Sequence, residues 1–191
     1  MAIADRIWWT RKARIQTEKR LLSNAFQAQL ILLWYSFFAV FVSVYYLKFN
    51  TTSEYSGVAW VIFSVMVLII SSFTSGLSFK ERASLIKECY ETLGGINQKA
   101  LRSSDDEVLE KEYGQVLNVC ENHTERDFNI ALCLEYLSHS NPCSETGGLT
   151  KKPTKFIWMM FVYYKVARFL FLILMYCLPI VFFLALETYD C

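Results

Sequence analysis

The chain has 191 residues with a formal net charge of +1, and 54% of its residues are hydrophobic. This apolar share exceeds that of ordinary soluble domains, and the length suits one modest domain or a small domain with membrane spans. The positively charged residues cluster in particular segments while the whole chain is close to neutral, so the net charge identifies no partner. The cysteines form no CxxC pair and no regular spacing, which favours scattered thiols over a disulfide framework or a zinc site: Cys89, Cys120, Cys133, Cys143, Cys177 and Cys191.

Residues 1–25 are basic and amphipathic, and they include the stretch RIWWTRKARIQTEKR. We expect a helix on the membrane surface, with apolar residues such as Ile7 and Trp8 towards acyl chains and cations such as Arg11 and Arg14 towards anionic headgroups. The alternative is a nucleic-acid arm. Such an arm would need an aromatic and basic surface that the rest of the chain does not extend, so we expect no direct nucleic-acid binding.

Residues 26–79 are predicted to form a transmembrane hairpin. Ala28–Leu47 and Val58–Phe79 contain no charged residue, and each is close to the ~20 residues that a helix needs to cross the hydrocarbon of a bilayer. Only a short link containing Lys48 separates them, which forces an antiparallel pair. Because Lys and Arg gather before the first span and after the second, the positive-inside rule predicts that the N-terminus and residues 80–155 are cytoplasmic.

Residues 156–191 hold a third apolar region, which carries Lys165 and Arg168. Cations in the middle of a bilayer are costly, so we expect both at headgroup level, in an interfacial helix that precedes a span over Phe169–Leu186. The alternative is a re-entrant or surface-lying C-terminal helix. Pro179 is expected to kink the third span.

Residues 80–140 are predicted to form a cytoplasmic helical bundle, followed by a turn-rich linker over residues 141–155. The stretch VMVLIISSFTSGLSFKERASLIKECYETL contains no Pro and no turn cluster, so we expect one unbroken helix from the second span through Phe79–Arg82. Thr124, with Asp127 three residues later, is expected to cap a later helix. The fold class is therefore an all-α membrane protein, in which a transmembrane hairpin continues into a cytoplasmic bundle and a third C-terminal span follows.

Small polar residues share one face of the second predicted span: Ser64, Ser71, Ser75 and Ser78. Ser72 and Gly76 form a neighbouring pair of small residues at the same four-residue spacing. Such a face mediates close helix packing, or in an oligomer it lines a water path. Both interpretations predict self-association.

The sequence contains no phosphate-binding glycine loop, nucleophile elbow or HExxH helix, and we expect neither an enzyme nor a cofactor or metal. Cys120 and His123 offer two metal ligands without a second pair at suitable spacing. His123 is interpreted instead as a local cap or a buried hydrogen-bonding residue.

Three stretches carry a resemblance to a known family: WWTRKARIQTEKRL before the first span, FKERASLIKECYETL after the second, and CENHTERDF in the later helices. Together with the tight hairpin, they resemble the SLATT proteins, which are two-transmembrane effectors associated with bacterial nucleotide-signalling and antiviral loci. The last stretch, with Glu121, Asn122, His123 and Asp127, resembles the branch found beside reverse transcriptases or nucleotidyltransferases.

The resemblance implies a pore-forming effector of antiviral defence in the bacterial inner membrane. A cytoplasmic partner or signal would gate it, and its opening would depolarise the membrane and arrest growth. The implied partners are the bilayer, further copies of the chain, and a reverse transcriptase or nucleotidyltransferase from the same locus. The alternative function is a membrane-anchored scaffold that recruits or restrains a cytoplasmic enzyme.

Overall fold

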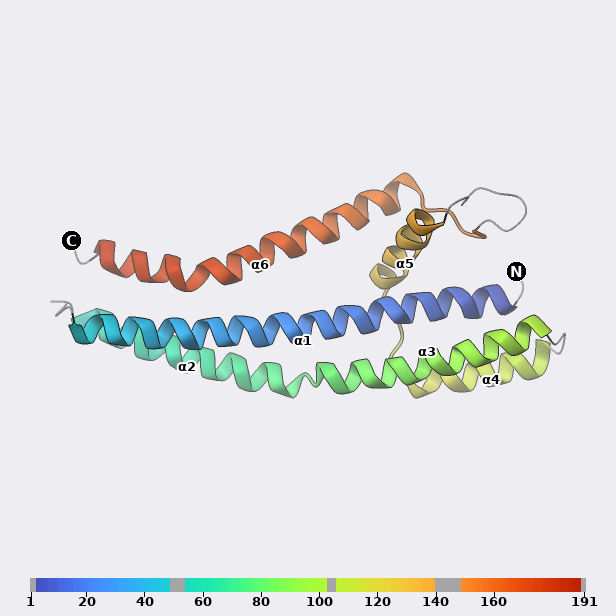
Figure 1. Ribbon diagram of the computed structural model, residues 1–191, viewed down its shortest axis with the longest axis horizontal. Helices are drawn as coiled ribbons and strands as arrows, with labels where there is room; N and C mark the ends of the chain where they lie inside the picture. Colours follow the sequence, from blue (N-terminus) through green and yellow to red (C-terminus); the bar gives the residue numbers. More distant parts are fainter. Residues whose placement is uncertain (1–2, 49–53, 103–105, 140–148, 190–191) are drawn as a thin grey trace. The chain divides into compact units, whose positions relative to one another are not determined.

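The computed structural model describes residues 3–48, 54–102, 106–139 and 149–189, and every regular element within these stretches is a helix. The all-α prediction is therefore confirmed, whereas residues 141–148 of the expected linker lie outside the described part of the chain. The helices are α1 (Ile3–Lys48), α2 (Glu54–Gly76), α3 (Phe79–Arg102), α4 (Asp106–Val119), α5 (Glu125–Ser138) and α6 (Lys155–Tyr189) (Figure 1).

The chain divides into two compact units. The first, here called the bundle unit, comprises Met1–Ser23 and Phe79–Lys165. The second, here called the span unit, comprises Asn24–Ser78 and Val166–Cys191. Helices α1 and α6 each contribute residues to both units without a break in their helical structure.

The span unit is held together by aromatic packing between α1, α2 and α6. Its buried cluster consists of Tyr35, Phe38, Val42, Trp60 and Phe63. Phe182 of α6 stacks on Phe63 with ring centroids 5.7 Å apart, and it meets the edge of Trp60 at 5.4 Å. Aromatic pairs in these geometries add to the effect of burial, so the C-terminal part of α6 packs directly on the hairpin.

The outer surface of the span unit is apolar. Leu68 and Phe73 of α2 are 68% and 70% exposed, and many Leu, Ile, Val and Phe residues of all three helices are also exposed. An apolar surface of this extent is unfavourable in water and suits lipid. In the part of the chain that the structure describes, three helices, including α6, are long and apolar enough to cross a membrane. The chain is accordingly a membrane protein.

Helix α6 runs through Pro179 without ending, and its ribbon bends towards its C-terminal end (Figure 1). A proline has no N–H to donate, so Pro179 leaves the carbonyl of Met175, four residues earlier, without its helical partner. The Tyr35 hydroxyl donates a 2.7 Å hydrogen bond to that carbonyl, and the Trp34 indole donates one of 3.1 Å to the next carbonyl, that of Tyr176. Helix α1 therefore satisfies the polar groups that the proline exposes, as an apolar surrounding requires.

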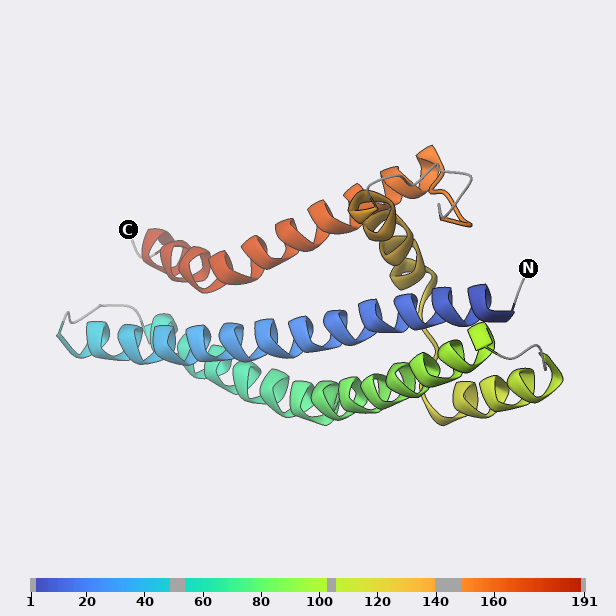
Figure 2. The same ribbon diagram turned by 45° about the vertical axis from the view of Figure 1, so that its right-hand side comes forward.

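The first part of α1 belongs to the core of the bundle unit. Ile7 is fully buried in a cluster with Leu93, Ile96, Leu109 and Tyr113. This differs from the expected surface helix, in which Ile7 faces acyl chains, because α3 and α4 supply the apolar partners. Helices α3 and α4 lie side by side (Figures 1 and 2).

The predicted unbroken helix through the end of α2 and the start of α3 is not observed. Helix α2 ends at Gly76 and α3 begins at Phe79 (Figure 1). Two hydrogen bonds of 3.3 Å between residues three apart end α2. Leu77 N–H donates to the Thr74 carbonyl, and Ser78 N–H donates to the Ser75 carbonyl. Ser78 then adopts a φ of 44°, the left-handed conformation that often follows a helix end but seldom holds a residue other than glycine.

Tyr35→Phe is expected to destabilise the span unit by about 1–3 kcal/mol, because it leaves the Met175 carbonyl without a donor. In a Pro179→Ala background, the alanine N–H restores the helical bond, so Tyr35→Phe should then cost under about 1 kcal/mol. A double-mutant cycle from unfolding in detergent micelles measures this coupling. If Tyr35→Phe lowered the free energy of unfolding equally in both backgrounds, the Tyr35 hydroxyl would not be replacing the hydrogen bond that Pro179 removes from the Met175 carbonyl.

Candidate functional site

Residues 120–124, here called the connector, join α4 to α5 and include most of the motif CENHTERDF. Helix α4 runs back along α3, since Lys99 pairs with Glu112 at 3.0 Å while Cys89 lies against Cys120. This antiparallel arrangement brings the connector beside the first turns of α3. The motif residues therefore lie where α1, α3 and α5 meet within the bundle unit.

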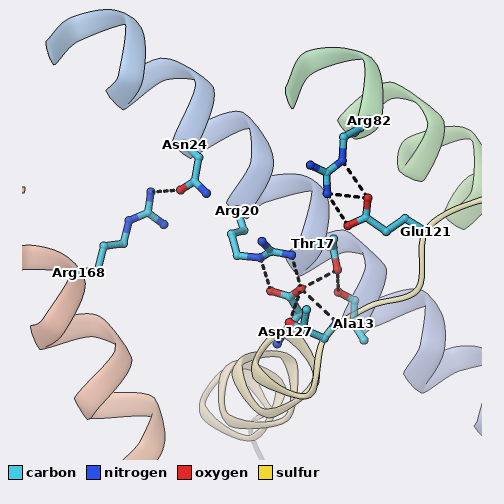
Figure 3. A network of polar contacts seen from close by, with 9 residues as sticks. Ala13, Thr17, Arg20, Asn24, Arg82, Glu121, Asp127 and Arg168 are labelled. Atoms are coloured by element: carbon cyan, nitrogen blue, oxygen red, sulfur yellow. Dashed lines mark hydrogen bonds and ion pairs between the residues drawn. The ribbon is translucent and has the colours of Figure 1, made fainter. Parts of the chain in front are cut away.

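Asp127 is the centre of this junction (Figure 3). Its side chain is fully buried and accepts hydrogen bonds from Arg20 Nε at 2.9 Å, Arg20 Nη2 at 3.0 Å and Thr17 Oγ1 at 2.9 Å. Thr124 and Asp127 also form the predicted capping box at the start of α5, which is confirmed. One carboxylate thus fixes the beginning of α5 and attaches it to α1.

The electrostatics of Asp127 follow from these contacts. Burial alone would raise the pKa of its carboxyl, but hydrogen bonds from Arg20 and Thr124 and the Arg20 charge outweigh burial and lower it. Asp127 is therefore ionised, and its buried charge is compensated by Arg20.

Glu121 makes the second attachment of the connector. It accepts hydrogen bonds from Arg82, from Nη2 to both carboxylate oxygens at 2.7 Å and from Nε at 2.9 Å (Figure 3). Arg82 lies in the first turn of α3, directly after the interruption at Leu77–Ser78. Both side chains are more than one third exposed, so this ion pair contributes less to stability than the buried one.

Arg14 was expected to face anionic headgroups at the membrane surface. It lies instead in the interior of the bundle unit. Its side chain is fully buried, and Nη1 donates to the Cys89 sulfur. Cys89 is in turn bonded to Cys120. The interpretation of these two cysteines as scattered thiols is therefore wrong, because the antiparallel packing of α3 and α4 brings together residues that are 31 positions apart.

His123 is half-buried, and its Nδ1 has no hydrogen-bond partner among the described residues. Its backbone N–H is bound by the Asn122 side chain at 3.0 Å. Burial, and next the charge of Arg14, lowers the pKa of the His123 imidazole, so the ring is neutral at physiological pH. Within the described stretches, no three His, Cys, Asp or Glu side chains are grouped as metal ligands.

The remaining predicted cations make different contacts. Arg168 donates a 3.1 Å hydrogen bond to Asn24 within the span unit (Figure 3). The Nε of Arg11 lies 3.3 Å from the position that a Cβ would take at Gly94, so this glycine permits the close approach of the Arg11 side chain to α3. The Lys165 ammonium lies 5.8 Å from the ring centre of Phe161.

The small polar residues of α2 are largely exposed on the span unit. Ser64, Ser72, Ser75 and Gly76 are exposed, and Ser71 is partly buried. Ser64 and Ser71 line a pocket of about 260 Å³ between α1 and α2, which Ser36 also lines. Ser78 lies at the interruption after α2, so the helical spacing that predicted a shared face ends before it.

Sequence reasoning missed a polar stripe on the inner face of α1. Thr10 contacts the Tyr113 hydroxyl at 2.9 Å, Arg14 contacts Cys89, and Thr17 contacts Asp127. These three residues recur at intervals of four and three, the spacing of one helix face. The spacing was visible in the sequence, but their partners come from distant helices.

Comparison with known proteins identifies the family. The model of the SMODS and SLOG-associating 2TM effector domain family 5 matches residues 2–186, and the chain belongs to this family. It is thus a two-transmembrane effector of the kind found in defence systems. Comparisons with curated proteins and with solved structures found no match. The matched range includes α6, so a third apolar helix lies inside the family domain.

Asp127→Asn is expected to destabilise the bundle unit by up to about 3–5 kcal/mol, because it removes a fully buried carboxylate and leaves the partly buried Arg20 without its counter-charge. Glu121→Gln removes the exposed pair and should cost under about 1 kcal/mol. Amide hydrogen exchange of α5 measures both effects. Equal protection of α5 in the Asp127→Asn variant and the natural protein would contradict this assignment.

The pH dependence of stability should report on His123. Because the folded state lowers the pKa of this imidazole, the unfolded chain binds the proton more readily, and stability falls as the pH drops below about 6.5. His123→Gln should reduce the acid-induced loss of bundle stability, measured from thermal unfolding at several pH values. The same loss in both proteins would exclude a contribution from His123.

Proposed function

We propose that this member of the effector family assembles into an oligomeric pore in the cytoplasmic membrane of a bacterium. In this proposal, a partner or signal acts on the bundle unit, the pore opens, and the resulting depolarisation arrests growth of an infected cell. The single observation that carries the proposal is the exposed face of small polar residues on α2, in a chain that belongs to a defence-effector family.

The proposed orientation places the bundle unit in the cytoplasm. Lys and Arg are concentrated before the first apolar stretch and after the second, and the link between these stretches has only Lys48. A cytoplasmic bundle could meet a reverse transcriptase or nucleotidyltransferase encoded at the same locus, which is the partner we propose. The N-terminus then lies on the cytoplasmic side.

Self-association is supported by the chemistry of α2. Small residues let two helix backbones approach closely in lipid, and hydroxyls on the same face can also line a water path. Ser64 donates its hydroxyl to the Trp60 carbonyl at 2.9 Å, and Ser36 donates to the Leu32 carbonyl at 2.9 Å. Each hydroxyl proton is thus satisfied within its own helix, while each oxygen keeps lone pairs for water or a neighbouring helix.

Signal transmission is proposed to run through α1. Asp127 attaches α5 to Thr17 and Arg20, and α1 remains helical from these residues into the span unit. The alternative path, from α3 to α2, crosses the interruption at Ser78. A displacement of α5 is therefore expected to act on the first span more directly than on the second.

A membrane-anchored scaffold is the second candidate function. The bundle unit exposes large apolar side chains at Leu101, Val119 and Leu137, which are 72%, 74% and 63% exposed. Such residues could contribute to a docking surface for an enzyme. A scaffold would keep its activity if unrelated spans replaced those of this chain, whereas a pore would not.

The pore proposal predicts that Ser71→Leu together with Ser75→Leu abolishes or strongly reduces ion flux. Leucine is too large for the close helix approach that small residues allow, and its apolar side chain expels water from a path lined by this face. The matched control is Val61→Leu with Val65→Leu on exposed positions of the same helix. Flux through liposomes or growth arrest in expressing cells measures the effect. Full activity of the double serine variant would contradict the pore and favour the scaffold.

A further inference from the structure

Arg14 is a buried cation whose charge meets no carboxylate among the described residues. Its Nη1 donates to the Cys89 sulfur, while Nε and Nη2 have no hydrogen-bond partner. An isolated guanidinium in a protein interior is strongly unfavourable. Tyr113 and His123 lie near enough to interact with its charge, but neither is a carboxylate, and Asp127 is already paired with Arg20. Among the described residues, the hydrogen-bond partner of the Arg14 guanidinium is the sulfur of Cys89, which can become an anion when it is a free thiol.

Cys89 and Cys120 are bonded in this structure, with Cα atoms 6.6 Å apart, within the range that a disulfide spans. Cys89 is buried in α3, whereas Cys120 directly follows α4 and is partly exposed. In the cytoplasm, where the proposed orientation places this unit, disulfides are usually transient and serve redox sensing or catalysis.

We propose that Cys89 and Cys120 form a reversible redox pair and that Arg14 holds the reduced Cys89 as a thiolate. A thiolate beside Arg14 compensates the buried positive charge. A nearby guanidinium is one of the arrangements that lower the pKa of a cysteine thiol. The carbonyl of Val116, 3.3 Å from the same sulfur, can accept a hydrogen bond from the thiol form, which favours that form and so limits the lowering of the pKa.

Oxidation by hydrogen peroxide then proceeds in two steps. The accessible Cys120 thiolate attacks one peroxide oxygen, forming an S–O bond while the O–O bond breaks, and hydroxide leaves. The Cys89 thiolate next attacks the Cys120 sulfur, forming the S–S bond while the S–O bond breaks, and a second hydroxide leaves. Both hydroxides take protons from solvent. The two sulfurs together lose two electrons, and the peroxide gains them.

The two redox states differ in the charge that faces α1. In the reduced state, Arg14 of α1 is paired with the Cys89 thiolate of α3. In the disulfide state, α3 is linked to the connector, but the sulfur carries no charge and Arg14 loses its counter-ion. Oxidation therefore strengthens the attachment of α3 to the connector while it weakens the attachment of α3 to α1.

The pKa of Cys89 provides the test, in the full chain in detergent with Cys133, Cys143, Cys177 and Cys191 replaced by Ala. Adding Cys120→Ser prevents the disulfide, and the pH dependence of alkylation by iodoacetamide then reports Cys89 alone. We expect a pKa at least about one unit below the ordinary ~8.5. Arg14→Gln should abolish this lowering. Arg11→Gln, one turn earlier on the same helix, is the matched control and should preserve it.

Peroxide treatment of the protein that retains Cys120 gives a second readout. With Arg14 present, the Cys120 sulfenic acid should become a disulfide before dimedone captures it, and dithiothreitol should reverse the bond. With Arg14→Gln, dimedone adduct at Cys120 should accumulate. An ordinary pKa for Cys89 in the Cys120→Ser protein, or a disulfide that dithiothreitol does not reduce, would overturn the proposal even if Arg14→Gln fails to fold. Neither readout depends on pore activity.

Discussion

The continuity of α1 is the constraint on which both units depend. Its 46 residues are shared between the two units, so one element must satisfy a polar bundle and an apolar span. Its packed face carries polar residues in the bundle unit and apolar or aromatic residues in the span unit. Thr10, Arg14 and Thr17 face polar partners in the bundle unit, whereas Tyr35, Phe38 and Val42 pack against aromatic side chains in the span unit.

Buried polar groups specify the register of the helices in both units, but by different means. In the bundle unit, the Asp127 carboxylate pairs with Arg20 and caps α5, so the charge and the helix end are satisfied together. In the span unit, Tyr35 and Trp34 donate to carbonyls that Pro179 disturbs. A wrong register of these helices would leave a charge or a carbonyl unsatisfied in an apolar surrounding, which is costly.

Local patterns in the sequence predicted the features that depend on near neighbours. The uncharged apolar runs predicted helices that are long and apolar enough to cross a membrane. Thr124 with Asp127 predicted the capping box of α5, because a capping box involves only four successive positions. Features set by distant partners were missed. Neither the burial of Arg14 nor the pairing of Cys89 with Cys120 follows from spacing alone, because both require the antiparallel register of α3 and α4. The interruption at Ser78 was missed because serine is not a characteristic helix breaker.

Helix α1 contributes residues to both units without a break, whereas the path from α2 to α3 is interrupted at Ser78. Comparing the stabilities of Ser78→Gly and Ser78→Ala tests the interruption most directly. Glycine adopts the left-handed conformation without steric cost, so we expect the glycine variant to be the more stable, by about 1 kcal/mol. In an unbroken helix, alanine would be favoured over glycine by about the same amount. A more stable alanine variant would therefore show that the helix runs unbroken through Ser78.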